Sequence, residues 1–528
     1  MKLKKLLGIT LVVVLTLLTF TASACTGIYV GPEASADGTI LMGRSNDHQG
    51  IWGNYAEIVE RVENVPGRTM AVDNGGTVFM PLPDTTYRYT ATPWLDSTVA
   101  AIGMARDAAA CANEYGVSMT MAVTAFANKD ALAADPLVPN GITECTANEL
   151  VICQSATARE AVNVLARLMD TYGSSECNIA MIADQSEAWY VEMYTGHQYA
   201  AVKLPADAVA VFGNEYNLTK LSDYEECIAS PALFTLPAEN GFAVYDEDGE
   251  MNLMKTYSLP FFEYSHMRTW IGHKLLGSGY GDYDAEAVYP LTFKPENKVS
   301  LTDVMNLLRN RYEGTPYCPD TTGRTDMRVI GTDTAMSVHV LETYPDLPAN
   351  MAVVTWLSMA PAAFGCFVPV SVCEDAIDPA YGSNQSAEEY GNFDFEHYAY
   401  YAMKAINTLV LTDEATYGPA AQSYWQSAEK GMARGMSEVL HEAAAKRAEG
   451  ADARSYITDY CVRMQKNVFK DAKFILNRLM FMMAENSNTM RRGTDPETHE
   501  VLRDDKPKSP MIIDLDPFVY EWIPAFVR

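Results

Sequence analysis

The sequence lacks several features that would assign it to common classes of protein. It has no long apolar run beyond its N-terminus, which argues against a membrane-embedded body. It has no Cys-x-x-Cys pair and no Walker A loop, which argues against zinc-ribbon, thioredoxin-like and nucleotide-hydrolysing proteins. His441-Glu442 has no second histidine at the spacing of a zinc protease helix. The glycine-rich segment 277–281 has Gly279 at its centre, so it is not a serine nucleophile elbow.

Positive charge is also scarce. The 528 residues include 39 Lys and Arg against 68 Asp and Glu, which gives a net charge of −29. Such a surface repels nucleic acid and anionic membranes, so we exclude nucleic acid as a partner. The length suits one large domain or two fused ones, and whether copies associate into a homo-oligomer stays open. The ten cysteines permit disulfides in an exported protein, but the sequence assigns no pair.

The N-terminus has the three parts of a secretory signal. Lys2, Lys4 and Lys5 precede an apolar stretch over residues 6–20, and an Ala-x-Ala pattern ends directly before Cys25. The apolar stretch is shorter than the roughly 20 residues of a spanning helix. We therefore expect residues 1–24 to be a removable signal peptide, the mature chain to be secreted or associated with the cell surface, and no stable membrane insertion after removal. The rival reading is a lipoprotein modified on Cys25.

The rest of the chain predicts a mixed fold. Residues 26–30 and 39–42 read as the strands of a β-hairpin with a turn over 31–38. Further strands are expected within 117–124, 180–183, 208–212 and 351–356, and helices over 157–172, 423–447 and 456–484. From about residue 387, alanine, methionine, glutamate and lysine become frequent. This predicts a catalytic domain over 25–386 and a mainly helical C-terminal portion over 387–528, packed on the catalytic body.

Cleavage before Cys25 would create a self-contained catalytic group. The residue would carry both a thiol and a free α-amine, whose unperturbed pKa of about 7.7–8.0 leaves a neutral fraction to act as a base. If the hairpin turn is centred between Ala34 and Ser35, Cys25 lies opposite Arg44, and Asp47 follows just past the strand end. A cation there would favour the thiolate, and a carboxylate would orient the amine. A surface ion pair is the alternative role for Arg44 and Asp47.

The sequence around Cys25 resembles the opening of the dipeptidase A-type cysteine peptidases. These are N-terminal nucleophile (Ntn) hydrolases, distantly similar to penicillin V acylases and bile salt hydrolases. The resemblance covers roughly residues 25–425 and rests on short motifs that occur in the family's order: Cys25-Thr26-Gly27-Ile28-Tyr29-Val30-Gly31, Gly43-Arg44-Ser45-Asn46-Asp47, Asn113-Glu114-Tyr115-Gly116-Val117, Thr157-Ala158-Arg159-Glu160-Ala161, Val209-Ala210-Val211-Phe212-Gly213-Asn214, Tyr312-Glu313-Gly314-Thr315-Pro316 and Ser423-Tyr424-Trp425.

The resemblance implies an α+β fold, a four-layer αββα sandwich of two antiparallel sheets between helical layers. It also implies hydrolysis of dipeptides without a metal or other cofactor. Residue by residue, Cys25 matches the nucleophile, Arg44 and Asp47 match the Arg-x-x-Asp beside it, and Asn214 matches the asparagine of the oxyanion hole. An amidase of N-acyl compounds is the alternative activity.

Four further residues are candidates for substrate binding. Thr120 or Thr124 would supply a second oxyanion donor or a pocket wall, although strand threonines are commonly structural. Tyr312 and Glu313 belong to a loop that would line the cleft. Relatives usually carry histidine before this tyrosine, whereas this chain has Arg311, which puts the details of the pocket in doubt.

Overall fold

The computed structural model describes residues 25–48, 53–93, 108–259, 263–324, 326–385, 392–487, 490–504 and 508–521. The predicted signal peptide, residues 1–24, and the predicted domain boundary after residue 386 lie outside these ranges. Within them, no helix is both long enough and apolar enough to cross a membrane.

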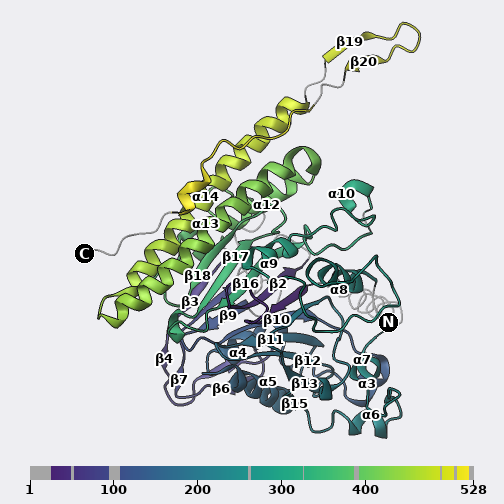
Figure 1. Cartoon of the computed structure of the whole chain (residues 1–528), viewed down its shortest axis with the longest axis vertical. Helices are drawn as coiled ribbons and strands as arrows, with labels where there is room; N and C mark the ends of the chain where they lie inside the picture. The colour runs from purple at the N-terminus through teal and green to yellow at the C-terminus, as the bar shows by residue number, and fades with distance from the viewer. Residues whose placement is uncertain are drawn as a thin grey trace, which may run out of the picture.

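Two antiparallel sheets form the centre of the molecule (Figure 1). The first has the strand order β14 (Val209–Phe212), β1 (Thr26–Val30), β2 (Ile40–Asp47), β16 (Ala335–Thr343), β17 (Val353–Met359) and β18 (Phe367–Ser371). The second has the order β15 (Cys227–Ala229), β13 (Tyr199–Lys203), β12 (Ala188–Met193), β11 (Asn178–Ala183), β10 (Ser118–Thr124), β9 (Ala108–Asn113), β8 (Tyr89–Pro93) and β3 (Glu57–Val59). Three small hairpins pair β4 (Val62–Glu63) with β7 (Thr85–Thr86), β5 (Thr69–Ala71) with β6 (Phe79–Pro81), and β19 (Met490–Thr494) with β20 (Val501–Asp504).

Helices cover the outer face of each sheet. The eight-stranded sheet packs against α4 (Glu144–Ile152) and α5 (Ala158–Tyr172), and the six-stranded sheet against α8 (Glu263–Leu276), α9 (Leu301–Leu308), α12 (Ala399–Val410), α13 (Glu414–Ala448) and α14 (Ala453–Ser487). Short helices lie in the connections: α3 (Lys129–Ala134), α6 (Thr235–Glu239), α7 (Leu253–Tyr257), α10 (Pro319–Thr322) and α11 (Pro379–Gly382), with single 3₁₀ turns at η1 (Leu221–Asp223), η2 (Ala349–Met351) and η4 (Pro517–Glu521). The predicted four-layer αββα arrangement is confirmed.

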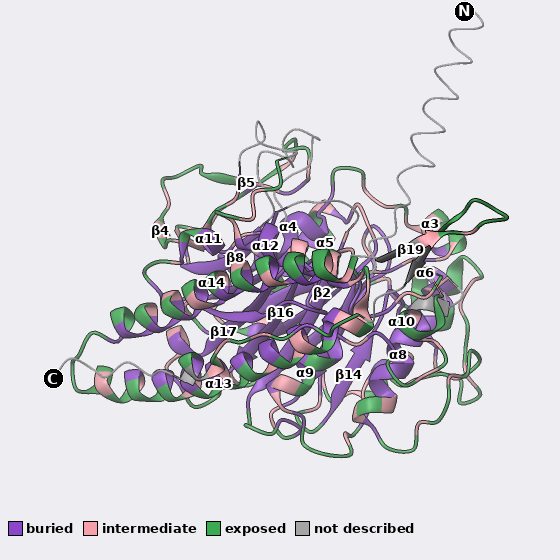
Figure 2. Cartoon of the chain, turned by 90° about the horizontal axis from the view of Figure 1, so that it is seen from above, coloured by how far each residue is buried: buried purple, intermediate pink, exposed green. Residues whose placement is uncertain are grey.

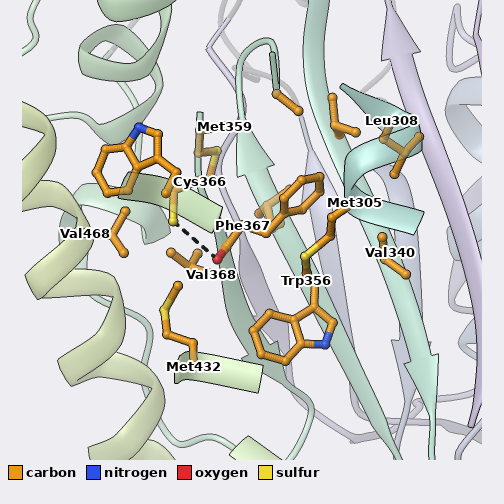
Figure 3. Close-up of a cluster of buried hydrophobic side chains, with 14 of the residues drawn as sticks. Met305, Leu308, Val340, Trp356, Met359, Cys366, Phe367, Val368, Met432 and Val468 are labelled. Carbon is orange, nitrogen blue, oxygen red and sulfur yellow. Dashed lines mark hydrogen bonds between the residues drawn. The ribbon is translucent and has the colours of Figure 1, made fainter. Parts of the chain in front are cut away.

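Three apolar cores separate the four layers, and the strands at the centre are buried throughout (Figure 2). Tyr29, Met181 and Phe212 belong to the core between the two sheets. The core between the six-stranded sheet and its helices is built around Trp356 and Phe367, with other apolar and sulfur-containing side chains packed close by (Figure 3). Burial on this scale is the main favourable contribution to folding.

The predicted elements are present, mostly with longer bounds. The helix expected over 157–172 is α5, capped by the Thr157 side chain, which accepts a hydrogen bond from the Glu160 backbone N–H. Its predicted apolar face is buried. The two C-terminal helices are α13 and α14, separated at Gly450, whose φ of +89° suits glycine. They lie side by side against the far edge of the six-stranded sheet (Figure 1), where the buried Gln465 side chain of α14 donates to the Pro369 carbonyl of β18.

Candidate active site

Cys25 lies immediately before β1 and is fully buried. Its Sγ is 3.3 Å from Arg44 Nη2 and 4.0 Å from Asn46 Oδ1. On the other side of the residue, the Arg268 guanidinium donates to the Cys25 carbonyl oxygen and, at 3.1 Å, to Thr26 Oγ1. The backbone and the thiol of Cys25 are therefore each held by an arginine.

The hairpin register differs from the expected one by two residues. Arg44 pairs with Gly27, and Thr26 pairs with Ser45, so Arg44 does not lie opposite Cys25. The turn is shifted because it is bound to distant segments: Glu33 N–H donates to the Ala206 carbonyl and Ala36 N–H to the Val299 carbonyl. A shift of two residues keeps every side chain on the same face of the sheet, so the Arg44 guanidinium still reaches the thiol.

A buried ion pair connects Arg44 to the N-terminus of α4. Arg44 Nη2 contacts Glu144 Oε1, and Arg44 Nη1 donates to the Ala109 carbonyl at 3.3 Å. Burial raises the pKa of the Cys25 thiol; Arg44 opposes the shift, whereas Glu144 and Asp47 reinforce it. Arg44 favours the thiolate, as expected of a cation there, but desolvation outweighs it and the net shift is upward. The thiol needs a base to remove its proton.

Asp47 is the last residue of β2, not a residue beyond it, and it is fully buried. Its Oδ2 accepts hydrogen bonds from Arg328 Nη2 and Ser45 Oγ, both at 3.3 Å. Burial raises the pKa of Asp47 to about 6, while Arg328 and Arg268 act to lower it. Two arginines therefore stabilise the Asp47 carboxylate, at the same end of the sheet as Cys25.

Asn214 follows β14 and is oriented by Arg268. Arg268 Nη2 donates to Asn214 Oδ1 at 2.7 Å, which leaves the Asn214 amide nitrogen as the donor. That nitrogen donates one hydrogen to the Thr124 carbonyl at 2.7 Å, and an amide nitrogen carries a second. Since the same arginine contacts the Cys25 carbonyl, Arg268 ties the proposed oxyanion donor to the nucleophile.

The four candidates for substrate binding fall at different distances from this cluster. Thr124 belongs to it, because its hydroxyl donates to Glu144 Oε2 at 3.3 Å. Thr120 is buried between the sheets, donating to the Ala109 carbonyl at 2.9 Å and lying 3.1 Å from His339 Nε2.

The hydrogen bonds of Tyr312 and Glu313 go to residues other than Cys25 and Arg44. Tyr312 is buried with φ +62°, and its hydroxyl donates to the Arg328 carbonyl at 2.7 Å. Glu313 accepts hydrogen bonds from Asn310 and from the Arg311 backbone and is brought into contact with neither Cys25 nor Arg44. The Arg311 side chain binds both oxygens of Asp320 at 2.7 Å, so the departure from the family pattern fastens this loop.

Sequence reasoning assigned no role to Arg268, Arg328, Glu144 or Glu176. One weak signal was available: Glu144 directly follows the N-cap Thr143, at the N-terminus of α4. Within the described ranges, no group of three or more His, Cys, Asp and Glu side chains is arranged to hold a metal ion.

Comparisons with known proteins find one family model and several similar sequences. The model of Peptidase family C69 matches residues 24–427. Probable dipeptidase B of Streptococcus pyogenes serotype M1 is 29% identical over 423 residues, covering 77% of this chain and 82% of that protein. Probable dipeptidase B of Lactococcus lactis subsp. lactis (strain IL1403) is 30% identical over 357 residues, covering 66% and 74%. Among solved structures, a mutant of the conjugated bile acid hydrolase from Clostridium perfringens aligns with a TM-score of 0.31 and 11% identity, over 63% of this chain and 89% of that one.

Proposed function

This chain belongs to peptidase family C69, and we propose that it is an exported dipeptidase whose nucleophile is Cys25, exposed as the mature N-terminal residue. Membership of the family supports peptide-bond hydrolysis, and the names of the two relatives support dipeptides as substrates. The Ala-x-Ala pattern before Cys25 supports export and cleavage at that bond.

One observation carries the proposal. The Cys25 thiol lies 3.3 Å from Arg44, and Asp47 and Asn214 belong to the same cluster of side chains. The four residues come from β1, β2 and the end of β14, which are adjacent strands of one sheet. A nucleophile, a carboxylate and an oriented amide donor are the parts that acyl transfer requires.

The raised pKa of the thiol gives the free α-amine its role. The neutral amine of Cys25 takes the thiol proton, and the thiolate attacks the scissile carbonyl carbon. Asp47 stabilises the resulting ammonium group, and Asn214 Nδ2 donates to the oxyanion. The ammonium then protonates the leaving amine as the peptide bond breaks. Water, deprotonated by the same amine, attacks the thioester and releases the acyl product with the thiol restored.

The test compares three proteins on a panel of dipeptides. The first begins with a free Cys25, verified by intact mass; the second carries Cys25→Ala; the third keeps one extra residue before Cys25. We expect amino-acid release from the first protein alone. Equal activity of the first and third proteins would exclude the α-amine as the base.

Two further measurements separate the rival functions. Cleavage of N-acyl amides in preference to dipeptides would indicate an amidase of N-acyl compounds. Isolation of the native protein with a lipid on the Cys25 sulfur would exclude the nucleophile and indicate a lipoprotein, because lipidation consumes the thiol.

A further inference from the structure

Two carboxyl groups, those of Glu144 and Glu176, lie beside Arg44, and Glu144 forms an ion pair with it. Glu144 Oε1 contacts Arg44, while Glu144 Oε2 accepts hydrogen bonds from Thr124 Oγ1 and Asn178 Nδ2, both at 3.3 Å. Glu176 Oε1 accepts a hydrogen bond from the backbone N–H of Glu144, at the N-terminus of α4. The two acidic side chains are therefore parts of one hydrogen-bonded group.

The pair brings two acidic groups close to one arginine, Arg44. Among the residues that the structure describes, Glu176 forms no salt bridge. Burial and then the neighbouring Glu144 raise the pKa of Glu176 to about 7. Both effects disfavour a second negative charge, and a cation bound beside the pair would offset the repulsion between the two carboxylates.

Glu144 also lies at a distance from the sulfur that suits a substrate. One Arg44 nitrogen contacts both groups, so the Glu144 carboxylate is within about 6 Å of Cys25 Sγ. In a dipeptide, the α-ammonium nitrogen is only two bonds from the carbonyl carbon that the thiolate would attack.

Thr124 joins the acidic pair to the proposed oxyanion donor. Its carbonyl accepts from Asn214 Nδ2 at 2.7 Å, and its hydroxyl donates to Glu144. Cys25 and Arg44 are fully buried, whereas Thr124 and Glu176 keep part of their surface exposed. Thr124 and Glu176 therefore form the solvent-exposed side of the cluster, and Glu144 lies behind them.

We propose that Glu144 and Glu176 form the subsite that binds the free α-ammonium group of the substrate's N-terminal residue, an inference that rests on the proposed dipeptidase activity. Glu144 also holds Arg44 in place, so Glu176 supplies the charge left for the ligand. The subsite selects substrates with an unblocked N-terminus and rejects their N-acylated counterparts, because acylation removes the cation that Glu176 would bind.

The experiment measures kcat/KM for alanyl-alanine and for N-acetyl-alanyl-alanine with the same preparations. We expect the wild-type protein, starting at Cys25, to prefer the free dipeptide at least about a hundredfold. Glu176→Gln should lower that preference at least about tenfold, by raising KM for the free dipeptide while leaving the acetylated one unaffected. Glu176→Asp should restore part of it, and Glu239→Gln, an exposed carboxylate on α6, should change nothing.

The ratio of two substrates is independent of how much of a variant is folded. Equal loss on both substrates, or a wild-type protein indifferent to acetylation, would overturn the ammonium subsite and leave the dipeptidase activity standing. A wild-type protein that cleaves neither substrate nor any dipeptide would overturn both proposals.

Discussion

Strands β2 and β16 carry a buried carboxylate near each end of their ladder, and the two ends differ in what surrounds it. Asp47 pairs with Ala335 at one end, and Glu342 pairs with Leu41 towards the other. Asp47 is stabilised by two arginines, Arg328 and Arg268. Glu342 receives neutral donors instead: Trp356 Nε1 at 2.8 Å, the Tyr344 hydroxyl at 3.0 Å and Thr39 Oγ1 at 3.2 Å.

The surroundings of the two acids indicate which one acts in the proposed reaction. Burial raises the pKa of both groups, to about 6 for Asp47 and to about 7 for Glu342. Neutral donors suffice for a carboxyl group that spends much of its time protonated. Neighbouring cations favour the charged form of a buried carboxylate, and one of the two arginines beside Asp47, Arg268, also contacts the Cys25 carbonyl.

Removing the central cation of the Asp47 end has the largest expected effect. Arg268→Met should lower kcat/KM for a dipeptide by about a thousandfold, because Asn214 and the Cys25 carbonyl both lose their donor. Steady-state hydrolysis, with circular dichroism to verify folding, measures this. Arg268→Lys should recover part of the activity, and Trp356→Phe, which removes a donor at the Glu342 end, should stay within about threefold of wild type. Similar losses for Arg268→Met and Trp356→Phe would show that the two ends are equivalent.

Neutralising each acid in turn sharpens the contrast. Asp47→Asn should reduce kcat by about tenfold to a hundredfold, because the α-ammonium group loses the charge that stabilises and orients it. Glu342→Gln keeps an acceptor for Trp356 and Tyr344 and should leave kcat within about threefold of wild type. The measurement is kcat for both variants on one dipeptide. A larger loss for Glu342→Gln than for Asp47→Asn would refute the assignment.

The last prediction concerns stability and pH and leaves activity aside. The pKa of Glu342 is about 7 in the folded protein and roughly 4.3 in an unfolded chain. Between these values the folded state holds a proton that the unfolded state has released, so this group's contribution to the unfolding free energy falls as pH rises from about 4.5 to 7. Glu342→Gln removes that loss. Relative to wild type, it should gain up to about 3 kcal/mol between pH 4.5 and pH 8, measured by urea unfolding. A stability difference that is the same at both pH values would contradict the pKa shift.

Much of the fold could be predicted because its signals are local. The hairpin strand over residues 26–30 and the amphipathic helix α5 follow from alternation and periodicity within a few turns of chain. The prediction that Arg44 lies near Cys25 holds although the predicted register was wrong by two residues. Side chains of a strand alternate between the two faces of the sheet, so a shift of two residues leaves Arg44 on the same face.

The remainder of the site could not be predicted because it depends on tertiary contacts. Arg268 and Arg328 enter from segments more than two hundred residues away, and Glu144 from a helix on the opposite sheet. The turn that set the register is held by residues 206 and 299, which no hairpin rule includes. The net pKa of the thiol also depended on burial, which outweighed the cation that the sequence revealed.

The contact between Gln465 and Pro369 bears on how this protein resists aggregation. An exposed edge strand offers unpaired backbone groups to a strand from another molecule. On β18, Pro369 has no amide hydrogen to offer, and its carbonyl oxygen is already bound by a side chain of α14. At Pro369 the β18 edge therefore offers a strand from another molecule neither a donor nor an unoccupied acceptor, which disfavours strand addition at this point of the sheet.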